Sequence, residues 1–164
     1  MSEVARITTP CGALSAEWED SRLIRLRFGS AADVSESVEA DGSVSADAES
    51  LIVQLQAYFE GDVDALATFA SIPEGTPFQM DVWRATAQIP YGETVTYGHI
   101  ARATGVGVEG SRAVGVALNQ NPLPLIVPCH RVIGANGDLT GFGGGLTWKR
   151  RLLDLEMPQF SLSW

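Results

Sequence analysis

The sequence predicts an α/β fold of the α+β kind, in which a small sheet covered by a helix precedes a mostly helical, winged helix-turn-helix-like domain. Residues 4–28 alternate between apolar and polar side chains as strands do, whereas helical periods dominate after residue 76. Charge divides at the same place, because residues 1–75 hold 14 acidic and 4 basic residues and residues 76–164 hold 6 and 7. We therefore expect two domains, 1–75 and 76–164.

The first domain begins as a sheet in which apolar side chains alternate with Arg25 and Arg27, with turns at "TPCG" and "EDSR". The acidic segment "GSAADVSESVEADGSVSADAES" (29–50) lacks aromatic residues and predicts a long mobile loop that gains a helical turn at its end and carries no chemistry. Residues 50–60 then show a helical period that ends at Gly61. This helix should cover the sheet.

Three helical patterns follow residue 76. In "TPFQMDVWRATAQIP", Thr76 is the N-cap, a proline takes the first helical position and Gln79 completes a capping box. In "YGETVTYGHIARATG", Thr96 caps a helix that ends at Gly105. The pattern "GSRAVGVALNQNP" predicts a third helix, from about Ser111 to the Asn-Pro pair.

The second and third of these helices, joined by a glycine-containing turn, resemble a helix-turn-helix, although two core-packing helices would give the same pattern. Gly110, Ser111 and Ala113 are small residues that suit either a close approach to a nucleic-acid backbone or close helix packing. Arg112 among them is either a solvated charge or a side chain that can insert into a base stack. The balanced charge of residues 76–164 permits phosphate contacts, with modest and salt-sensitive affinity.

The stretch "VPCHRVI" (127–133) places a cysteine and a histidine in a run that reads as a buried strand. Cys129 is either a small core residue or a nucleophile. A nucleophilic cysteine must lose its proton, and His130 is the nearest acceptor in sequence. Because neighbours on a strand point to opposite faces, contact between the two requires a bend at Pro128 or a bridging water.

The pattern "LTWKRRLLDLEMP" predicts a C-terminal helix with Thr147 as its cap and with Trp148, Leu152 and Leu155 as its buried stripe. Glu156 falls on the flank of that stripe, in the last turn. A carboxylate there faces the negative end of the helix dipole, and a hydrogen bond to His130 would compensate it. The alternative is a solvated surface glutamate.

The 164 residues, 45% of them apolar, are enough for a globular protein with its own core. The sequence has no apolar run that would span a bilayer, and "MSEVARITTP" lacks the features of a secretory leader. We expect a cytoplasmic protein in which Cys11 and Cys129 are free thiols. A structural zinc site is not expected, because Cys-x-x-Cys and His-x-x-x-His spacings are missing.

Several stretches together resemble one protein family: "FQMDVW", "IPYGETVTYGHIA", "SRAVGVALNQNP" and "NPLPLIVPCHRVIGANGDLTGFGGGLTWKRRLLDLE". They are similar to the O6-alkylguanine-DNA alkyltransferases, also called methylated-DNA–protein-cysteine methyltransferases. The match covers residues 76–156 nearly without gaps, and its PCHRV core is highly specific. Residues 1–75 match only loosely, through "TPCGAL" and "AYFEG".

The resemblance implies a DNA repair protein that moves an alkyl group from guanine O6 to its own cysteine, irreversibly and once per molecule. Cys129 would be the acceptor and His130 the water-mediated base. Glu156 would orient His130, and Asn121 would hold the turn before the active-site segment. Tyr97 would donate a proton to the leaving guanine oxygen and help to displace the target phosphate.

By the same resemblance, the second helix of the pair would enter the minor groove through Gly110, Ser111 and Ala113, and Arg112 would fill the hole left by a flipped nucleotide. The partner would be double-stranded DNA with O6-alkylguanine, or O4-alkylthymine as an alternative lesion. The protein would act as a monomer, and no membrane would be involved. The substrate pocket would be lined by Leu118, Pro124, Val132, Phe142, Gly143 and Gly144.

This chain departs from the family pattern at a few positions. Phe142 stands where many relatives have tyrosine, and Gly143 leaves room for alkyl groups bulkier than methyl. Members that bind zinc use Cys and His residues in the N-terminal part, where this chain has Cys11 and no histidine, so neither a metal nor another cofactor is expected. A DNA binder without catalysis and a Cys–His hydrolase are the alternatives, and the presence of Cys129 argues against the first.

Overall fold

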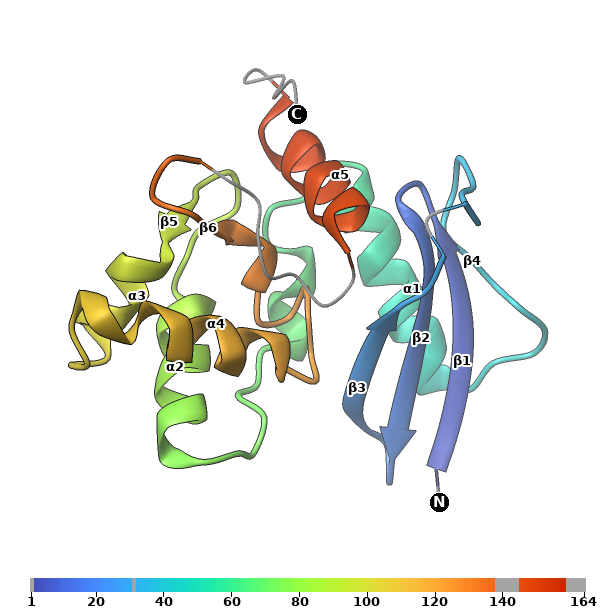
Figure 1. Cartoon of the computed structure of the whole chain (residues 1–164). Coiled ribbons are helices and arrows are strands. Elements are labelled where there is room, and N and C mark those ends of the chain that lie inside the picture. The colour runs from blue at the N-terminus through green and yellow to red at the C-terminus, as the bar shows by residue number, and fades with distance from the viewer. Residues whose placement is uncertain (1, 31, 138–144, 159–164) are drawn as a thin grey trace. The chain divides into compact units, whose positions relative to one another are not determined.

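The computed structural model describes residues 2–30, 32–137 and 145–158. The chain forms two compact units, Met1–Ala70 and Ser71–Trp164 (Figure 1). The boundary expected from the sequence, between residues 75 and 76, and the boundary between the units both lie in the connection between the short helix η1 (Ala65–Phe69) and helix α2 (Pro77–Ala87).

The first unit is built on an antiparallel sheet with the strand order β3-β2-β1-β4. Strands β1 (Ser2–Thr9), β2 (Gly12–Glu19) and β3 (Arg22–Phe28) are joined by the two turns that the sequence predicts. Asp20 and Ser21 both have positive φ, which is the backbone twist that a two-residue hairpin turn requires.

Helix α1 (Ala46–Phe59) covers the sheet, as predicted (Figure 1). Its N-cap, Ser45, accepts a hydrogen bond from Ala48, and the Ser45 amide donates to the Glu3 side chain on β1. The face that the helix buries consists of Ala48, Leu51, Leu55 and Tyr58.

The prediction of a long loop over residues 29–50 is wrong in part. Strand β4 (Glu39–Ala40) pairs with β1, and Val34 bridges Thr9. The helical turn predicted at the end of the segment is present, because α1 begins at residue 46. The acidic composition that suggested a mobile loop is also what the start of a helix favours, because Asp47 and Glu49 lie at the positive end of the helix dipole.

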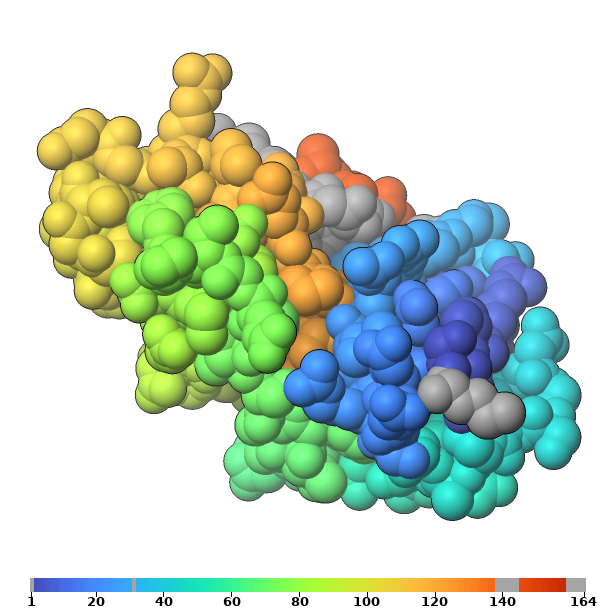
Figure 2. All heavy atoms as spheres, turned by 90° about the horizontal axis from the view of Figure 1, so that it is seen from below, coloured from blue at the N-terminus to red at the C-terminus, as the bar shows by residue number. Residues whose placement is uncertain are grey.

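The second unit is mostly helical. Helix α2 carries the predicted capping box, in which Thr76 accepts from the Gln79 amide and the Gln79 side chain accepts from the Thr76 amide. Helices α3 (Tyr97–Ala103) and α4 (Ser111–Asn119) form the predicted pair, with η2 (Val108–Gly110) between them. Helices α3 and α4 pack against each other, and α2 lies beside α4 (Figure 2).

Two very short strands pair in parallel, and both adjoin the candidate site. Strand β5 (Val95–Thr96) precedes α3 directly, and β6 (Val132–Ile133) follows the 3-10 helix η3 (Cys129–Arg131) directly. In the ladder, Val95 is opposite Val132 and Thr96 is opposite Ile133. The pairing therefore brings the start of α3 next to the segment that contains the cysteine.

Helix α5 (Leu146–Glu156) is the predicted C-terminal helix. Its N-cap is Gly145 rather than Thr147, because the helix already begins at Leu146 and Thr147 lies inside its first turn. Gly145 has a φ of 88°, which glycine adopts without strain. Its buried stripe includes Trp148 and Leu152, as predicted, but Leu153 replaces Leu155. No helix in the described ranges is long and apolar enough to cross a membrane.

Candidate active site

The cysteine is presented by a compact turn rather than by the buried strand that the sequence predicted. Asn121 ties the turn together, because its Nδ2 donates to the Val127 carbonyl at 3.0 Å and its Oδ1 accepts from the Leu123 amide at 3.0 Å. Leu125 has a φ of 73°, which reverses the chain direction inside the turn. Prolines at three positions remove the amide donors that a strand ladder would need, and these are Pro122, Pro124 and Pro128.

Cys129 and His130 are consecutive residues of the 3-10 helix η3. On such a helix neighbouring side chains diverge by about 120°, so the opposition expected of two strand neighbours does not arise. Cys129 is 7% exposed and His130 is completely buried. Cys129 is a free thiol.

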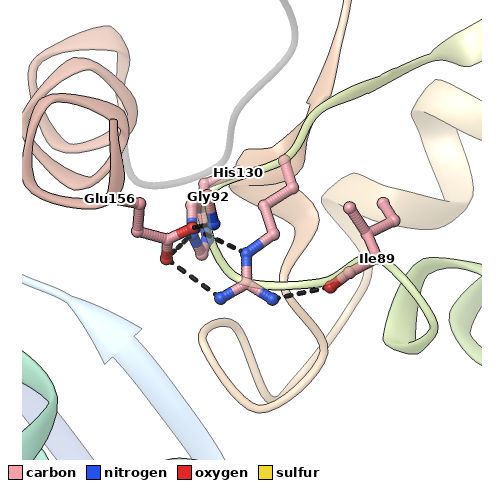
Figure 3. Close-up of polar contacts among 5 residues, drawn as sticks. Ile89, Gly92, His130 and Glu156 are labelled. Carbon is pink, nitrogen blue, oxygen red and sulfur yellow. Dashed lines mark hydrogen bonds and ion pairs between the residues drawn. The ribbon is translucent and has the colours of Figure 1, made fainter. Parts of the chain in front are cut away.

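His130 pairs with Glu156, which is buried and not the solvated surface residue that was the alternative. His130 Nε2 lies 2.7 Å from Glu156 Oε2, and Figure 3 shows the carboxylate reaching from α5 toward the ring. Arg131 donates to both oxygens of the same carboxylate, from Nε to Oε1 at 2.7 Å and from Nη2 to Oε2 at 3.0 Å. The Gly92 amide adds a longer hydrogen bond to Oε1, at 3.4 Å.

The charges around this pair determine which nitrogen of His130 carries the proton. Burial alone would raise the pKa of Glu156, but the charges and hydrogen bonds of His130 and Arg131 outweigh burial and hold that pKa well below its usual range. Glu156 is therefore ionised at neutral pH and can only accept from Nε2. The free lone pair of the neutral ring is then on Nδ1, a buried atom without a hydrogen-bond partner among the described residues.

The pKa values of His130 and Cys129 both reflect burial. Burial lowers the pKa of His130, although Glu156 opposes this. Burial raises the pKa of Cys129 to about 11, while a hydrogen bond from Asn121 and the charge of Lys149 act in the opposite direction. A thiol with this pKa is ionised in only about one molecule in ten thousand at pH 7, so it needs a base to react.

Lys149 is a residue of the site that sequence reasoning missed. It is completely buried on α5, and its Nζ donates to the Val132 carbonyl at 2.6 Å and to the Tyr97 hydroxyl at 3.5 Å. Burial lowers the pKa of Lys149 to about 8, and the negative charge of a Cys129 thiolate acts in the opposite direction. One sequence signal could have identified it. Lys149 lies seven residues before Glu156, which is two helical turns away on the same face of the helix.

Tyr97 is the first residue of α3 and stands between two other helices. Lys149 Nζ lies 5.6 Å from the centre of its ring. On the side of α4, a Cβ added at Gly115 would be 3.8 Å from the ring. This is an ordinary van der Waals distance, so α4 passes next to the tyrosine at this glycine.

The remaining predicted residues fall into separate groups. Arg112 and Ala113 are exposed at the start of α4, and Gly110 and Ser111 are half-buried beside them. Leu118 and Val132 belong to the same apolar cluster as Cys129, and Pro124 is buried in the turn. Phe142, Gly143 and Gly144 lie outside the described residues. Within the described ranges, the structure has no group of three or more His, Cys, Asp or Glu residues that could hold a metal ion.

The fold and the site together define a helix-turn-helix protein with a cysteine next to a buried His–Glu pair. Residues 77–158 match the family model of the 6-O-methylguanine DNA methyltransferase, DNA binding domain. The chain belongs to the O6-methylguanine-DNA methyltransferase family.

Individual relatives agree with this assignment. A methylated-DNA–protein-cysteine methyltransferase of Methanosarcina acetivorans is 56% identical over 103 residues, which cover 63% of this chain and 65% of that protein. The Mycobacterium bovis protein of the same name is 53% identical over 104 residues, or 63% and 61% of the two chains. The matched segment thus spans less than two thirds of these relatives. A crystal structure of Mycobacterium tuberculosis OGT in complex with DNA aligns with a TM-score of 0.72 and 39% identity, over 94% of this chain and 92% of that chain.

Proposed function

We propose that this protein repairs DNA carrying O6-alkylguanine, by transferring the alkyl group irreversibly to Cys129, once per molecule. The observation that carries the proposal is the buried His130–Glu156 pair, which leaves an unprotonated ring nitrogen in the helix that carries the free thiol. The names of the family and of its relatives support the reaction class.

In the proposed reaction, His130 Nδ1 takes the thiol proton through one water molecule. Glu156 keeps Nε2 protonated and stabilises the imidazolium that forms. The charge of Lys149 favours the thiolate, because it lowers the pKa of Cys129. The base and the charge together offset the burial that keeps the resting thiol neutral.

The sulfur then attacks the alkyl carbon of a flipped guanine. A bond from sulfur to carbon forms as the bond from carbon to O6 breaks, and guanine leaves with a proton from the Tyr97 hydroxyl. Asn121 holds the turn that presents the sulfur, as its two hydrogen bonds support. The bound alkyl group has no route off the sulfur, so each molecule acts once.

The proposed partner is double-stranded DNA. The start of α4 would enter the minor groove through its small residues, and the exposed Arg112 would take the place of the flipped nucleotide. The Mycobacterium tuberculosis protein, whose structure was determined in complex with DNA, supports this partner. A reduced Cys129 suits the cytoplasm, which we propose as the location of the protein.

Intact-protein mass spectrometry after incubation with duplex DNA containing O6-methylguanine tests the proposal. We expect one added methyl group per molecule and, after digestion, its location on Cys129. Cys129→Ala should abolish transfer and keep DNA affinity. Cys11 is a matched control because it is also buried, so Cys11→Ala should still accept the methyl group. An unmodified Cys129, or release of many product equivalents per molecule, would overturn the proposal.

A further inference from the structure

Arg131 has no part in the chemistry proposed above, although it makes polar contacts with two elements around the site. Its side chain is 11% exposed. Besides the two hydrogen bonds to Glu156, its Nη1 donates to the Ile89 carbonyl at 2.8 Å, just beyond the end of α2. Its guanidinium carbon lies 5.7 Å from the centre of the Tyr91 ring.

We propose that Arg131 is a positioning residue, which fixes the Glu156 carboxylate for His130 and keeps His130 neutral so that Nδ1 remains available as a base. The proposal rests on the proposed function, because it assigns a role within the same site.

The geometry accounts for the first part of this role. A carboxylate held at one oxygen can rotate about its terminal torsion, whereas a guanidinium that bonds both oxygens fixes the carboxylate plane. Glu156 Oε2 is shared between Arg131 Nη2 and His130 Nε2. The Ile89 carbonyl holds the other side of the guanidinium, as Figure 3 shows, so the arginine itself cannot turn away.

The charges account for the second part. Glu156 alone would favour the imidazolium, because an opposite charge at this distance raises the pKa of a histidine. Three charged groups act on the pKa of His130, namely Glu156 and Lys149 from α5 and Arg131 from η3. Cys129 precedes His130 in the same short helix. Tyr91 faces Glu156 and Arg131 from the connection after α2. After burial, which lowers the pKa of His130 most, Arg131 lowers it further by opposing Glu156.

Two measurements on Arg131→Met and Arg131→Lys test the proposal. The first is an NMR titration of the His130 ring, with the exposed His99 as an internal reference, since the chain has 2 histidines. The second is the single-turnover rate of methyl transfer as a function of pH. Arg84→Met is the matched control, because Arg84 is exposed on α2.

In Arg131→Met we expect the pKa of His130 to rise by about 1, since the charge of Glu156 then acts with less opposition. The acidic limb of the pH–rate profile should move to higher pH by the same amount, so that the rate on that limb falls about tenfold. Arg131→Lys keeps the charge and should leave the titration near that of the unaltered protein, but it should slow transfer because the two-point contact is lost. Arg84→Met should change neither measurement.

An unchanged His130 titration and pH profile in Arg131→Met, with only stability reduced, would show a merely structural role and overturn the proposal. If Arg131→Met does not fold, Arg131→Lys decides, since an unchanged transfer rate in that variant would also overturn it. Failure of the proposed function is separately visible. In that case the unaltered protein is not methylated, whereas the histidine titration, which needs no DNA, still reports on Arg131.

Discussion

Replacing Glu156 by glutamine tests the electrostatic core of the site. The substitution keeps the size of the side chain and one acceptor oxygen, but it removes the charge that faces His130 and Arg131. Glutamine can retain one of the short hydrogen bonds that the carboxylate makes at 2.7 Å, and the charge of Arg131 is then left in a largely buried place. The stability of the protein should fall as a result.

The expected magnitude follows from the burial of this ion pair. Removal of one partner from a buried pair costs about 3–5 kcal/mol. Because one hydrogen bond is retained, the loss of stability in Glu156→Gln should be at the lower end, about 3 kcal/mol. With a typical urea dependence, the unfolding midpoint should fall by roughly 1–2 M. The pKa of Glu156 is held low in the folded protein, so its contribution is complete above the unfolded pKa of about 4.3 and is lost as pH falls through the folded value.

Urea unfolding followed by circular dichroism at neutral and acidic pH measures both the size and the pH dependence. Asp154→Asn is the control, because Asp154 is exposed on the same helix and its loss should change stability by less than about 0.5 kcal/mol. A loss in Glu156→Gln of less than about 1 kcal/mol at neutral pH would refute the reasoning. A difference that stays the same size on acidification would refute it as well.

The other predictions concern separate residues. Lys149→Met removes the charge that lowers the pKa of Cys129, so single-turnover transfer near neutral pH should slow by about tenfold, and an unchanged rate would exclude the lysine as an electrostatic aid. Arg112→Ala should slow repair of duplex DNA by about tenfold but barely affect the free base, because its proposed role is base extrusion; equal effects on the two substrates would remove that role. Thr76→Ala removes the side-chain acceptor of the capping box, which binds the Gln79 amide, and keeps the backbone amide that donates to the Gln79 side chain. The substitution should reduce stability to urea by about 1 kcal/mol, and a loss close to zero would mean that the cap contributes little.

Short-range signals explain what could be predicted from the sequence. The capping box at Thr76 and the cap at Thr96 depend on residues three positions apart, and the structure has both helices where they were expected. The hairpin of β2 and β3 is equally local. Such elements need no knowledge of distant parts of the chain, because their hydrogen bonds close within one turn.

The features that could not be predicted depend on contacts between distant residues. Glu156 is buried because Arg131 and His130, about 25 positions earlier, neutralise and bond its carboxylate. Lysine is almost never fully buried without a partner, and the partners of Lys149 lie on β6 and α3. The apolar run before Cys129 resembled a strand because its pattern does not reveal that Asn121 bonds the chain into a turn.

No connecting residues separate the ladder of β5 and β6 from the short helices that carry the site residues. On one side Thr96 is both the last ladder residue and the cap of the helix that starts with Tyr97, and on the other Val132 follows η3 at once. Insertion of a single residue at either junction would rotate a functional side chain away from its neighbours, because no flexible spacer can absorb it. Insertions and deletions should therefore be tolerated in the surface connections, but they should disrupt the site at the junctions between β5 and α3 and between η3 and β6.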